Sequence, residues 1–297
     1  MTDETRRELS PEAPLGVFDS GLGGLTVVRA LLEELPHERI VYLGDTARVP
    51  YGTRSRDTVI RYARGCAQVL IRRNVKALVV ACNTVSAVAL DLLRAELDLP
   101  VIGVVEPGAS AAVQAAESVV PVTGSTAGVK IGVLGTAGTI SSGAYARAVS
   151  QISTRFEVVG QAAPLLVPLV EEGWLTGEVP ELAVRRYVQP LTDAGASVIV
   201  LGCTHYPLLE STIARVATAV ARHPVVIVDS ASATAAEIKT LLQSRRIPPA
   251  SEGIEPYPRL ELLVTDTPAG FQAVAERFLG GYDVPDVLQI DIDPVEA

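Results

Sequence analysis

Cysteine is scarce in this chain of 297 residues, which contains only Cys66, Cys82 and Cys203. Three cysteines without paired short spacings exclude a disulfide framework and favour a reducing compartment. No apolar run approaches the roughly eighteen residues that a membrane-spanning helix needs. The opening segment, MTDETRRELSPEAP, is charged where a signal peptide would be apolar. We therefore expect a cytoplasmic protein with no membrane partner.

Positive charge is also limited. The chain has 25 Lys and Arg against 34 Asp and Glu, a formal net charge of -9, so it lacks a general positive field for a polyanion. Six arginines occur between Arg54 and Arg73, but apolar positions interrupt them, which is typical of a solvated helix face. The sequence predicts no nucleic-acid partner. At 48% hydrophobic residues, the chain can bury the core of one large or two modest domains.

Short apolar runs alternate with segments of helical spacing, such as Thr84 to Glu96, Thr139 to Ser150 and Glu181 to Ala194. Most of the apolar runs lack polar alternation, which is typical of strands buried on both faces of a parallel sheet. This order predicts an α/β fold with mainly parallel sheets. The expected strands are Leu15 to Phe18, Arg39 to Tyr42, Ala77 to Ala81, Val101 to Val105, Lys130 to Leu134, Arg155 to Val159, Val198 to Leu201, Val225 to Val228 and Leu260 to Val264.

Two segments of the chain each have a similar counterpart further on. GVFDSGLGG from Gly16 resembles GVLGTAGTI from Gly132, and ALVVACNT from Ala77 resembles VIVLGCTH from Val198. Because the two pairs keep the same order at nearly the same separation, they predict two halves of similar fold. The run PVTGSTAG, residues 121–128, has the composition of a loop. The acidic C-terminal segment DVPDVLQIDIDPVEA is expected to fray.

Cys82 and Cys203 each follow a strand-like run, at the point where the next helix is expected to begin. In open α/β sheets the ligand crevice lies at these carboxyl ends of the strands. A helix N-terminus lowers the pKa of a nearby thiol, so we expect that either cysteine can be a thiolate near neutral pH. Two such thiols on facing halves could act as acid and base on opposite faces of one carbon, as in a cofactor-free racemase or epimerase.

Two further interpretations of the cysteines stay open at this point. A free cysteine is most often a small buried hydrophobe, and we assign that role to Cys66 within the helical segment YARGCAQVLI. Cys203 and His205 could instead bind a metal, but no two further ligands follow at zinc-like spacing.

Polar residues near the strand ends provide further candidates. Asp19 and Ser20 follow the first strand in FDSGLGG, where they could orient a substrate ammonium or bond a thiol. The glycines of that motif lack GxGxxG spacing and indicate a tight turn. His205 stands two residues after Cys203 and could relay its proton. Possible donors to an anionic or polar ligand are Tyr51, Gly52, Asn83, Thr84 and Thr204.

For two of these candidates, and for Glu171, an ordinary structural role explains the sequence at least as well as ligand contact. Asn83 and Thr84 fit helix capping as well as ligand contact. Glu171, in PLVEEGW, has the default interpretation of a solvated helix end.

Six motifs occur in a recognisable order: FDSGLGGLTV, LGDTARVPYG, ACNTVSA, GVLGTAGTISSGAY, PLVEEG and LGCTHYPLL. Together they resemble the glutamate racemases of the aspartate/glutamate racemase superfamily, over about Gly16 to Ser230. The specific part of the signal is the pair of cysteine motifs together with DSG and PYG at matching spacing. No single motif would suffice.

The resemblance implies interconversion of L- and D-glutamate without pyridoxal phosphate, nucleotide or metal, which supplies D-glutamate for bacterial peptidoglycan. It also implies two α/β halves related by a pseudo-twofold axis, with the active site between them. The first half would comprise residues 14–105 and 212–275, and the second residues 106–211, with flexible tails at 1–13 and 283–297. Family members are commonly dimers, so a homodimer is expected.

The same resemblance assigns roles to individual residues. Cys82 and Cys203 are the expected catalytic acid and base, with Asp19 assisting the first and Glu171 and His205 assisting the second. The expected substrate contacts are Asp19, Ser20, Tyr51, Gly52, Asn83, Thr84, Thr204 and His205. One departure is Ala163, where many relatives carry a cysteine that is not one of the catalytic pair, so the predicted activity is unaffected.

Other functions stay open from the sequence. A racemase for aspartate or another amino acid would look similar, whereas a related decarboxylase would keep only one cysteine. A two-lobed protein could bind an amino acid without chemistry, although it has no use for paired cysteines. A redox dithiol is disfavoured because the two cysteines lack C-x-x-C spacing.

Overall fold

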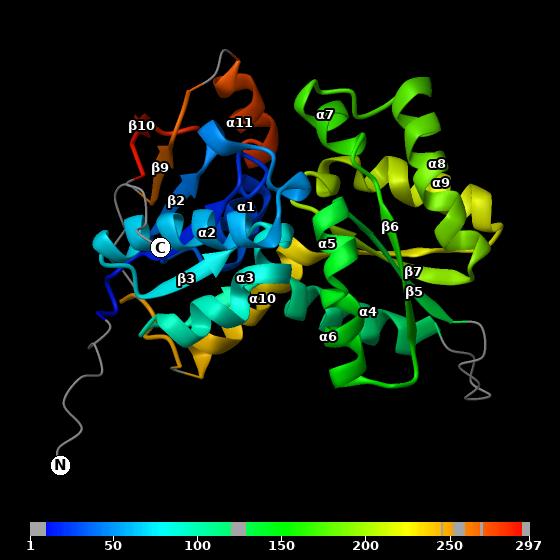
Figure 1. The fold of residues 1–297 in the computed structure, drawn as a ribbon, viewed down its shortest axis with the longest axis horizontal. Coiled ribbons are helices and arrows are strands. Elements are labelled where there is room, and N and C mark those ends of the chain that lie inside the picture. The colour runs from blue at the N-terminus through cyan, green and yellow to red at the C-terminus, as the bar shows by residue number, and fades with distance from the viewer. Residues whose placement is uncertain (1–9, 120–128, 245, 252–258, 268–269, 293–297) are drawn as a thin grey trace.

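A computed structural model of the chain describes residues 10–119, 129–244, 246–251, 259–267 and 270–292. Its strands form a six-stranded sheet of order β10-β9-β2-β1-β3-β4 and a four-stranded sheet of order β6-β5-β7-β8. All strand pairs in the described residues are parallel. Figure 1 shows the two sheets in two lobes that lie side by side. The predicted α/β fold with two mainly parallel sheets is confirmed.

The strands have the following bounds. The first sheet contains β1 (Leu15–Asp19), β2 (Ile40–Gly44), β3 (Ala77–Val80), β4 (Val101–Gly103), β9 (Leu260–Val264) and β10 (Val287–Gln289). The second sheet contains β5 (Lys130–Gly135), β6 (Glu157–Ala162), β7 (Ala196–Gly202) and β8 (Val226–Asp229).

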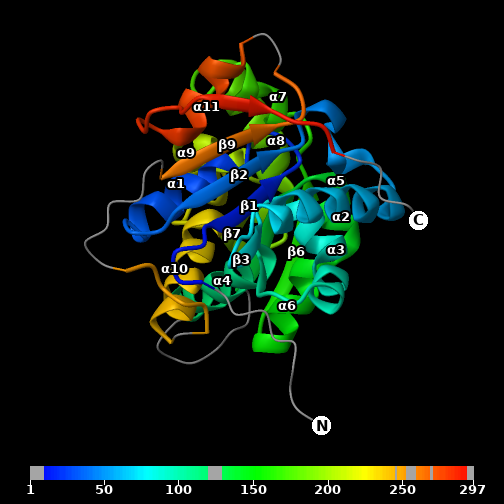
Figure 2. The same ribbon diagram turned by 90° about the vertical axis from the view of Figure 1, so that its left-hand side faces the viewer.

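Helices cover both faces of each sheet. The α-helices are α1 (Leu25–Glu34), α2 (Arg56–Arg72), α3 (Asn83–Glu96), α4 (Val105–Val119), α5 (Ala137–Ser142), α6 (Ala144–Ile152), α7 (Leu166–Glu171), α8 (Glu178–Asp193), α9 (Glu210–Ala221), α10 (Ser230–Gln243) and α11 (Phe271–Leu279). Three short 3₁₀ helices are η1 (Thr46–Arg48), η2 (Tyr51–Thr53) and η3 (Tyr206–Leu209). In Figure 2, α10 and α11 lie beside α1, although they come from the far end of the chain.

The two halves repeat one strand order. β2-β1-β3-β4 in the first sheet corresponds to β6-β5-β7-β8 in the second. Cys82 follows β3 and Cys203 follows β7, so the two cysteines occupy equivalent places in the two sheets. The internal repeat predicted from the sequence is therefore a repeat of fold.

The central strands are fully buried, as their continuous apolar runs predict. All residues of β1, β2 and β3 are buried, because helices cover both faces of the sheet. One apolar cluster packs α1 against the first sheet and continues through α8, α9 and β7 of the second half. Smaller clusters lie between the first sheet and α2 and α3, and between the second sheet and α4 and α6.

Three sequence expectations need correction. β8 pairs with β7, so the second sheet extends beyond the expected boundary at residue 211. β10 pairs with β9, so part of the expected tail 283–297 belongs to the first sheet. The expected helix Thr139 to Ser150 is divided by Gly143, whose φ of 66° is left-handed, into α5 and α6. The predicted loop at 121–128 lies outside the described residues.

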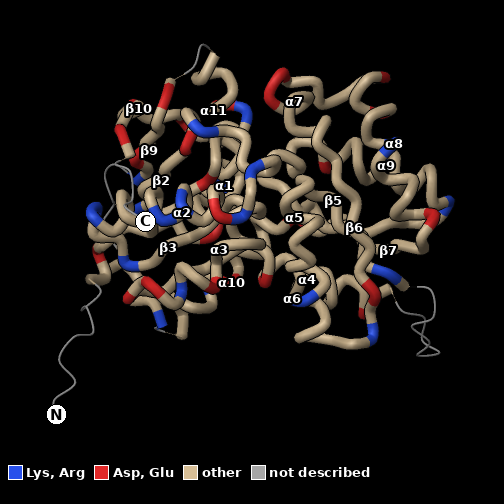
Figure 3. Tube along the Cα trace, viewed as in Figure 1, with Lys and Arg blue, Asp and Glu red and all other residues tan. Residues whose placement is uncertain are grey.

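Lys and Arg are scattered among Asp and Glu over both lobes in the view of Figure 3. The six arginines between Arg54 and Arg73 lie on α2 and next to its ends, and most are exposed, as expected of a solvated helix face. Within the described part of the chain, no helix combines the length and the apolar character that crossing a membrane requires.

A buried ion pair fixes the start of β3, the strand that leads to Cys82. Lys76 is fully buried, and its Nζ lies 2.6 Å from Glu38 Oε2 and donates to the Pro11 carbonyl at 2.7 Å. The other carboxylate oxygen of Glu38 accepts from the Ala250 amide. Burial lowers the pKa of Lys76, against the opposing effect of Glu38. The pair therefore joins the N-terminal segment, β3 and the segment before β9.

Replacing Lys76 by Met should lower the free energy of unfolding by about 3–5 kcal/mol, because it leaves the Glu38 carboxylate buried without a cation. Lys239→Met is the matched control, since Lys239 pairs with Glu34 at 2.7 Å in an exposed position; it should cost less than about 1 kcal/mol. Urea unfolding of both variants measures the difference. Equal losses would contradict the prediction, and Lys76→Met combined with Glu38→Gln should recover part of the loss.

Candidate active site

The carboxyl ends of the two sheets enclose a cavity of about 330 Å³. Its walls come from both halves: the segments after β1, β2 and β3 on one side, and those after β5, β6 and β7 on the other. The residues that line it are Ser20, Gly21, Val49, Pro50, Tyr51, Gly52, Thr53, Cys82, Asn83, Thr84, Thr136, Ala137, Pro164, Val167, Pro168, Glu171, Cys203, Thr204 and His205.

The cavity brings together residues that are far apart in the sequence. Of the site residues expected from the sequence, all but Asp19 line this cavity. Asp19 is buried directly behind it, at the end of β1 and next to Ser20. The structure therefore places the expected site residues together, while their individual roles stay predictions.

Cys82 lies beside a hydroxyl and a buried carboxylate. It is the N-cap of α3, and its Sγ lies 3.5 Å from Ser20 Oγ. Burial and then the nearby charge of Asp19 raise the pKa of the Cys82 thiol to about 12. Burial also raises the pKa of Asp19, although His205 and backbone amides oppose that rise. The expectation of a thiolate near neutral pH is therefore wrong for Cys82, because desolvation outweighs the helix N-terminus.

Cys203 lies beside an imidazole ring. Its Sγ is 3.9 Å from His205 Nδ1, and His205 Nε2 is 3.0 Å from Glu171 Oε1. Burial lowers the pKa of His205, but the hydrogen bonds to Cys203 and Glu171 outweigh it and raise that pKa to about 10. At neutral pH the ring is therefore an imidazolium that donates from both nitrogens. The two thiols thus have opposite neighbours, a carboxylate at Cys82 and a cation at Cys203.

The start of α3 offers donors to an anion. Asn83 and Thr84 are its first residues, and no side chain caps this helix end. Instead of capping, Asn83 Nδ2 donates to the Tyr145 hydroxyl at 2.9 Å, and Thr84 Oγ1 lies 2.9 Å from Thr136 Oγ1. Both partners belong to the second half, so these side chains join the halves at the edge of the cavity. Asn83 Oδ1 is buried without a hydrogen-bond partner.

Sequence reasoning missed several residues of the site. Thr136 and Tyr145 lie within the motif GVLGTAGTISSGAY, which contributed to the predicted repeat and to the family resemblance but to no predicted site residue. Asp45 was also missed: it is fully buried, and it accepts from the Tyr51 hydroxyl and from Arg48 Nε and Thr265 Oγ1. These bonds hold Tyr51 at the cavity wall. The acidic residue in LGDTARVPYG was the available signal.

Gly23 permits the two halves to approach closely. A Cβ atom at this position would lie 2.3 Å from Thr204 Oγ1 and 2.5 Å from His205 Nδ1. Thr26, one turn later, donates to the Thr204 carbonyl at 3.0 Å. The expected tight turn in FDSGLGG is therefore also the place where the first half contacts the residues that follow Cys203.

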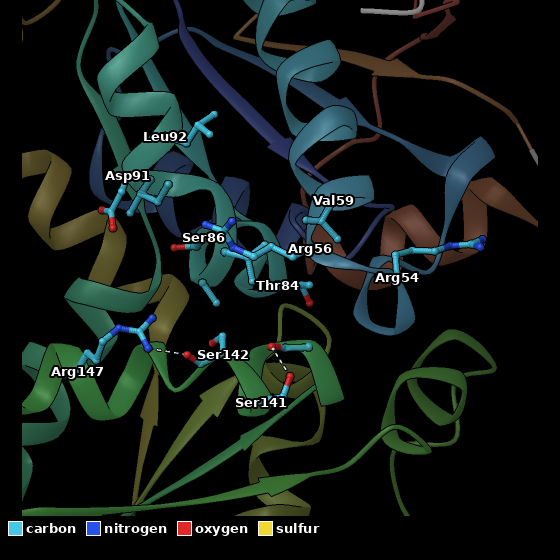
Figure 4. A pocket seen from close by; sticks show the side chains of 14 residues that line it. Arg54, Arg56, Val59, Thr84, Ser86, Asp91, Leu92, Ser141, Ser142 and Arg147 are labelled. Atoms are coloured by element: carbon cyan, nitrogen blue, oxygen red, sulfur yellow. Dashed lines mark hydrogen bonds between the residues drawn. The ribbon is translucent and has the colours of Figure 1, made fainter. Parts of the chain in front are cut away.

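A second cavity, of about 360 Å³, adjoins the first and shares Thr84 with it (Figure 4). It is lined by Arg54, Arg56 and Arg147 together with several hydroxyl groups. Among the described residues that line it, Asp91 is the only one with a carboxylate, and none is a cysteine or a histidine. This second cavity therefore lacks a pair of groups that could exchange a proton. The candidate active site is the cavity that contains the two cysteines.

Comparisons with known proteins identify the family of the chain. The sequence profile of the Asp/Glu/Hydantoin racemase family matches residues 16–238, so the chain belongs to that family. A glutamate racemase of Geobacter metallireducens is 45% identical over 285 residues, which cover 95% of this chain and 98% of the relative.

Two solved structures extend the likeness to the fold. A glutamate racemase of Francisella tularensis in complex with D-glutamate is 33% identical, with a TM-score of 0.83 over 96% of this chain and 99% of that one. The glutamate racemase isoform RacE1 of Bacillus anthracis is 37% identical, with a TM-score of 0.84 over 97% of this chain and all of that one.

The neighbours of Cys82 should control its reactivity. Asp19→Asn removes a charge that raises the pKa of Cys82, so alkylation of Cys82 by iodoacetamide at pH 8.5 should be faster than in the unchanged protein. Ser20→Ala removes a hydrogen bond that lowers this pKa, so the same reaction should be slower. Each unit of pKa changes the thiolate fraction about tenfold. Mass spectrometry of the Cys82 peptide gives the rates, and equal rates in all three proteins would contradict this account.

Proposed function

We propose that this protein is a glutamate racemase that interconverts L- and D-glutamate without a cofactor. The observation that carries the proposal is one cavity between two similar halves, with Cys82 on one side beside Asp19 and Cys203 on the other beside His205. Membership of the racemase family and the names of its relatives support glutamate as the substrate. Among the described residues, no group of three or more His, Cys, Asp or Glu side chains could hold a metal ion.

The reaction needs an acid and a base on opposite faces of the substrate α-carbon. In the proposed mechanism the Cys203 thiolate, beside the imidazolium of His205, removes the α-proton, while Cys82 is still a thiol and delivers a proton to the other face. The C–H bond on one face breaks as the S–H bond of Cys203 forms, and the S–H bond of Cys82 breaks as the new C–H bond forms. The reverse reaction exchanges these roles.

The α-carbon of an amino acid is a weak acid, so the site must stabilise charge that develops on the substrate carboxylate. The backbone amides at the start of α3 and the hydroxyls of Thr84 and Thr204 are the proposed donors. Ser20 would orient the ammonium group, with the buried carboxylate of Asp19 behind it, and Tyr51 and Gly52 would complete the substrate contacts. Each well-placed donor contributes about 3–4 kcal/mol in a site that excludes water.

Cys82→Ser and Cys203→Ser should each lower the rate of racemisation by about 10³-fold or more, because a serine hydroxyl is far too weak an acid to replace the thiol. Proton NMR of the α-proton of L-glutamate in D2O, together with optical rotation, measures exchange and racemisation. Cys66→Ser is the control, since Cys66 is buried in α2 outside the cavity; it should keep most of the activity. Full activity of either of the first two variants would exclude the two-thiol mechanism.

The same assay distinguishes the alternatives. Exchange with L-aspartate in place of L-glutamate would indicate the related aspartate activity, and absence of exchange with both would favour a binding protein. Unchanged activity after dialysis against EDTA is expected if no metal takes part. The proposed cellular role, which rests on family membership, is the supply of D-glutamate for peptidoglycan in the cytoplasm.

We also propose that the protein is a homodimer. Seven large apolar side chains of the described residues are exposed, and four of these lie between residues 165 and 182, on and around α7 and α8. These four are Leu165, Trp174, Val179 and Leu182. Because α7 and α8 are in contact, these exposed apolar side chains lie on neighbouring elements. Exposed apolar surface favours contact with another protein, and in a homo-oligomer that protein is a second copy of the chain.

Trp174→Arg combined with Leu182→Arg should shift the protein from dimer to monomer in sedimentation velocity, because two cations would be buried at the interface. Ile152→Arg is the control, since Ile152 is 49% exposed at the end of α6, away from these side chains; it should leave the dimer intact. A monomeric unchanged protein, or a dimer that persists in the double variant, would refute this arrangement.

A further inference from the structure

The helix α11 contacts the active site from the C-terminal part of the chain. It belongs to the first half, where it packs on α1, and it lies beyond residues 16–238, the extent of the family match. Two neighbouring residues near its end, Arg277 and Phe278, reach across to the second half. They contact the two residues that accompany Cys203, namely Glu171 and His205.

Arg277 fixes the end of α7. Its Nη1 donates to the carbonyl of Val170 at 3.1 Å and to that of Glu171 at 2.6 Å. The last carbonyls of a helix lack partners within the helix, and an arginine satisfies both their hydrogen-bonding capacity and the negative end of the helix dipole. Gly173 leaves room for this contact, because a Cβ atom there would lie 2.7 Å from Arg277 Nη2.

Phe278 fixes the ring of His205. It is fully buried, and its ring meets the imidazole edge to face, with centroids 5.1 Å apart and an interplanar angle of 82°. His205 in turn bonds Glu171 through Nε2 and faces Cys203 through Nδ1. The Glu171 side chain is 52% exposed, so its position depends on the bond to His205 and on the backbone that Arg277 holds.

We propose that Arg277 and Phe278 are positioning residues for the Glu171–His205 pair, and that α11 thereby couples the closed arrangement of the two halves to proton transfer at Cys203. This inference rests on the proposed racemase function and deepens it. When α11 is docked, the carboxylate and the imidazole are held in line with the Cys203 sulfur. Without these contacts the pair loses the support of α11, whereas the Cys82 side keeps its own partners.

Arg277→Met tests the proposal, because it keeps an apolar side chain of similar reach and removes every donor. Misplacement of a catalytic group by about 1 Å can cost about 100-fold in rate, so kcat for glutamate should fall between about tenfold and 100-fold. KM should change by less than about threefold, because every expected substrate contact except His205 is untouched. Arg277→Lys, which retains one donor, should restore part of the rate.

Isotope effects separate a positioning role from a general loss of structure. In Arg277→Met, only the step at Cys203 becomes slower. The isotope effect should therefore rise for whichever 2-deuterated enantiomer gives its deuteron to Cys203, and fall toward one for the other enantiomer, whose deuteron goes to Cys82. A merely structural defect would not move the two isotope effects in opposite directions.

Matched variants complete the design. Arg215→Met removes an exposed arginine that pairs with Glu181 at 2.9 Å outside the cavity, and it should leave the rate and both isotope effects unchanged. Phe278→Leu keeps a buried apolar side chain but removes the aromatic ring that meets His205, so the two isotope effects should diverge in this variant as well. It replaces Arg277→Met as the test if that variant folds poorly. Arg277→Met combined with Glu171→Gln should be little slower than Glu171→Gln alone, since both act on one pair.

These experiments distinguish a failure of the proposed racemase function from a failure of the proposed role of α11. If the unchanged protein does not racemise glutamate, the proposed function fails. If it does, but Arg277→Met and Phe278→Leu keep their rates or lower both isotope effects together, only the role of α11 is overturned. Divergent isotope effects in these variants, with Arg215→Met unchanged, would establish it.

Discussion

The close approach of two parallel sheets, end to end, is the constraint on which the candidate site depends. Each sheet alone presents one cysteine at a strand end, and neither end forms a closed cavity. The halves meet because Gly23 has no side chain to collide with Thr204 and His205, and because Thr26 and Thr84 bond groups of the second half. Small residues at this contact thus determine the distance between two thiols that are far apart in sequence.

Burial in this contact affects the two cysteines differently. Desolvation favours the neutral form of a thiol, and at Cys82 the carboxylate of Asp19 acts in the same direction. At Cys203 the hydrogen bonds of His205 to Cys203 and to Glu171 raise the pKa of the imidazole and keep it a cation, despite its own burial. Two cysteines that look equivalent in the sequence and in the strand order are therefore opposite in electrostatic environment. An acid and a base are needed at once, so this difference is what the proposed reaction requires.

The sequence was sufficient for the features that depend on local pattern, such as the buried strands, the repeat and the strand-end cysteines. It failed where the result depends on tertiary contact. The strand β8 was expected, but its pairing with β7 is decided by tertiary contact, and β10 is too short for a clear pattern. Desolvation of Cys82 depends on how the halves pack, so local helix arguments misjudged its pKa. Arg277 and Phe278 stand in an ordinary amphipathic helix, and only the fold places them against Glu171 and His205.

The asymmetry of the site has a consequence for turnover under the proposed mechanism. After one reaction from the resting state, Cys203 carries the proton taken from the substrate, and Cys82 has given its own proton to the substrate. The Cys82 thiolate now lies beside Asp19, and the Cys203 thiol lies beside the imidazolium. This arrangement is less favourable than the resting one for the same reason that the pKa of Cys82 is raised. The enzyme must either run the reverse reaction or return its protons through solvent before the next cycle in the same direction. Those protons need access to water, and the contacts between α11 and the second half would then influence the return step as well as the chemistry.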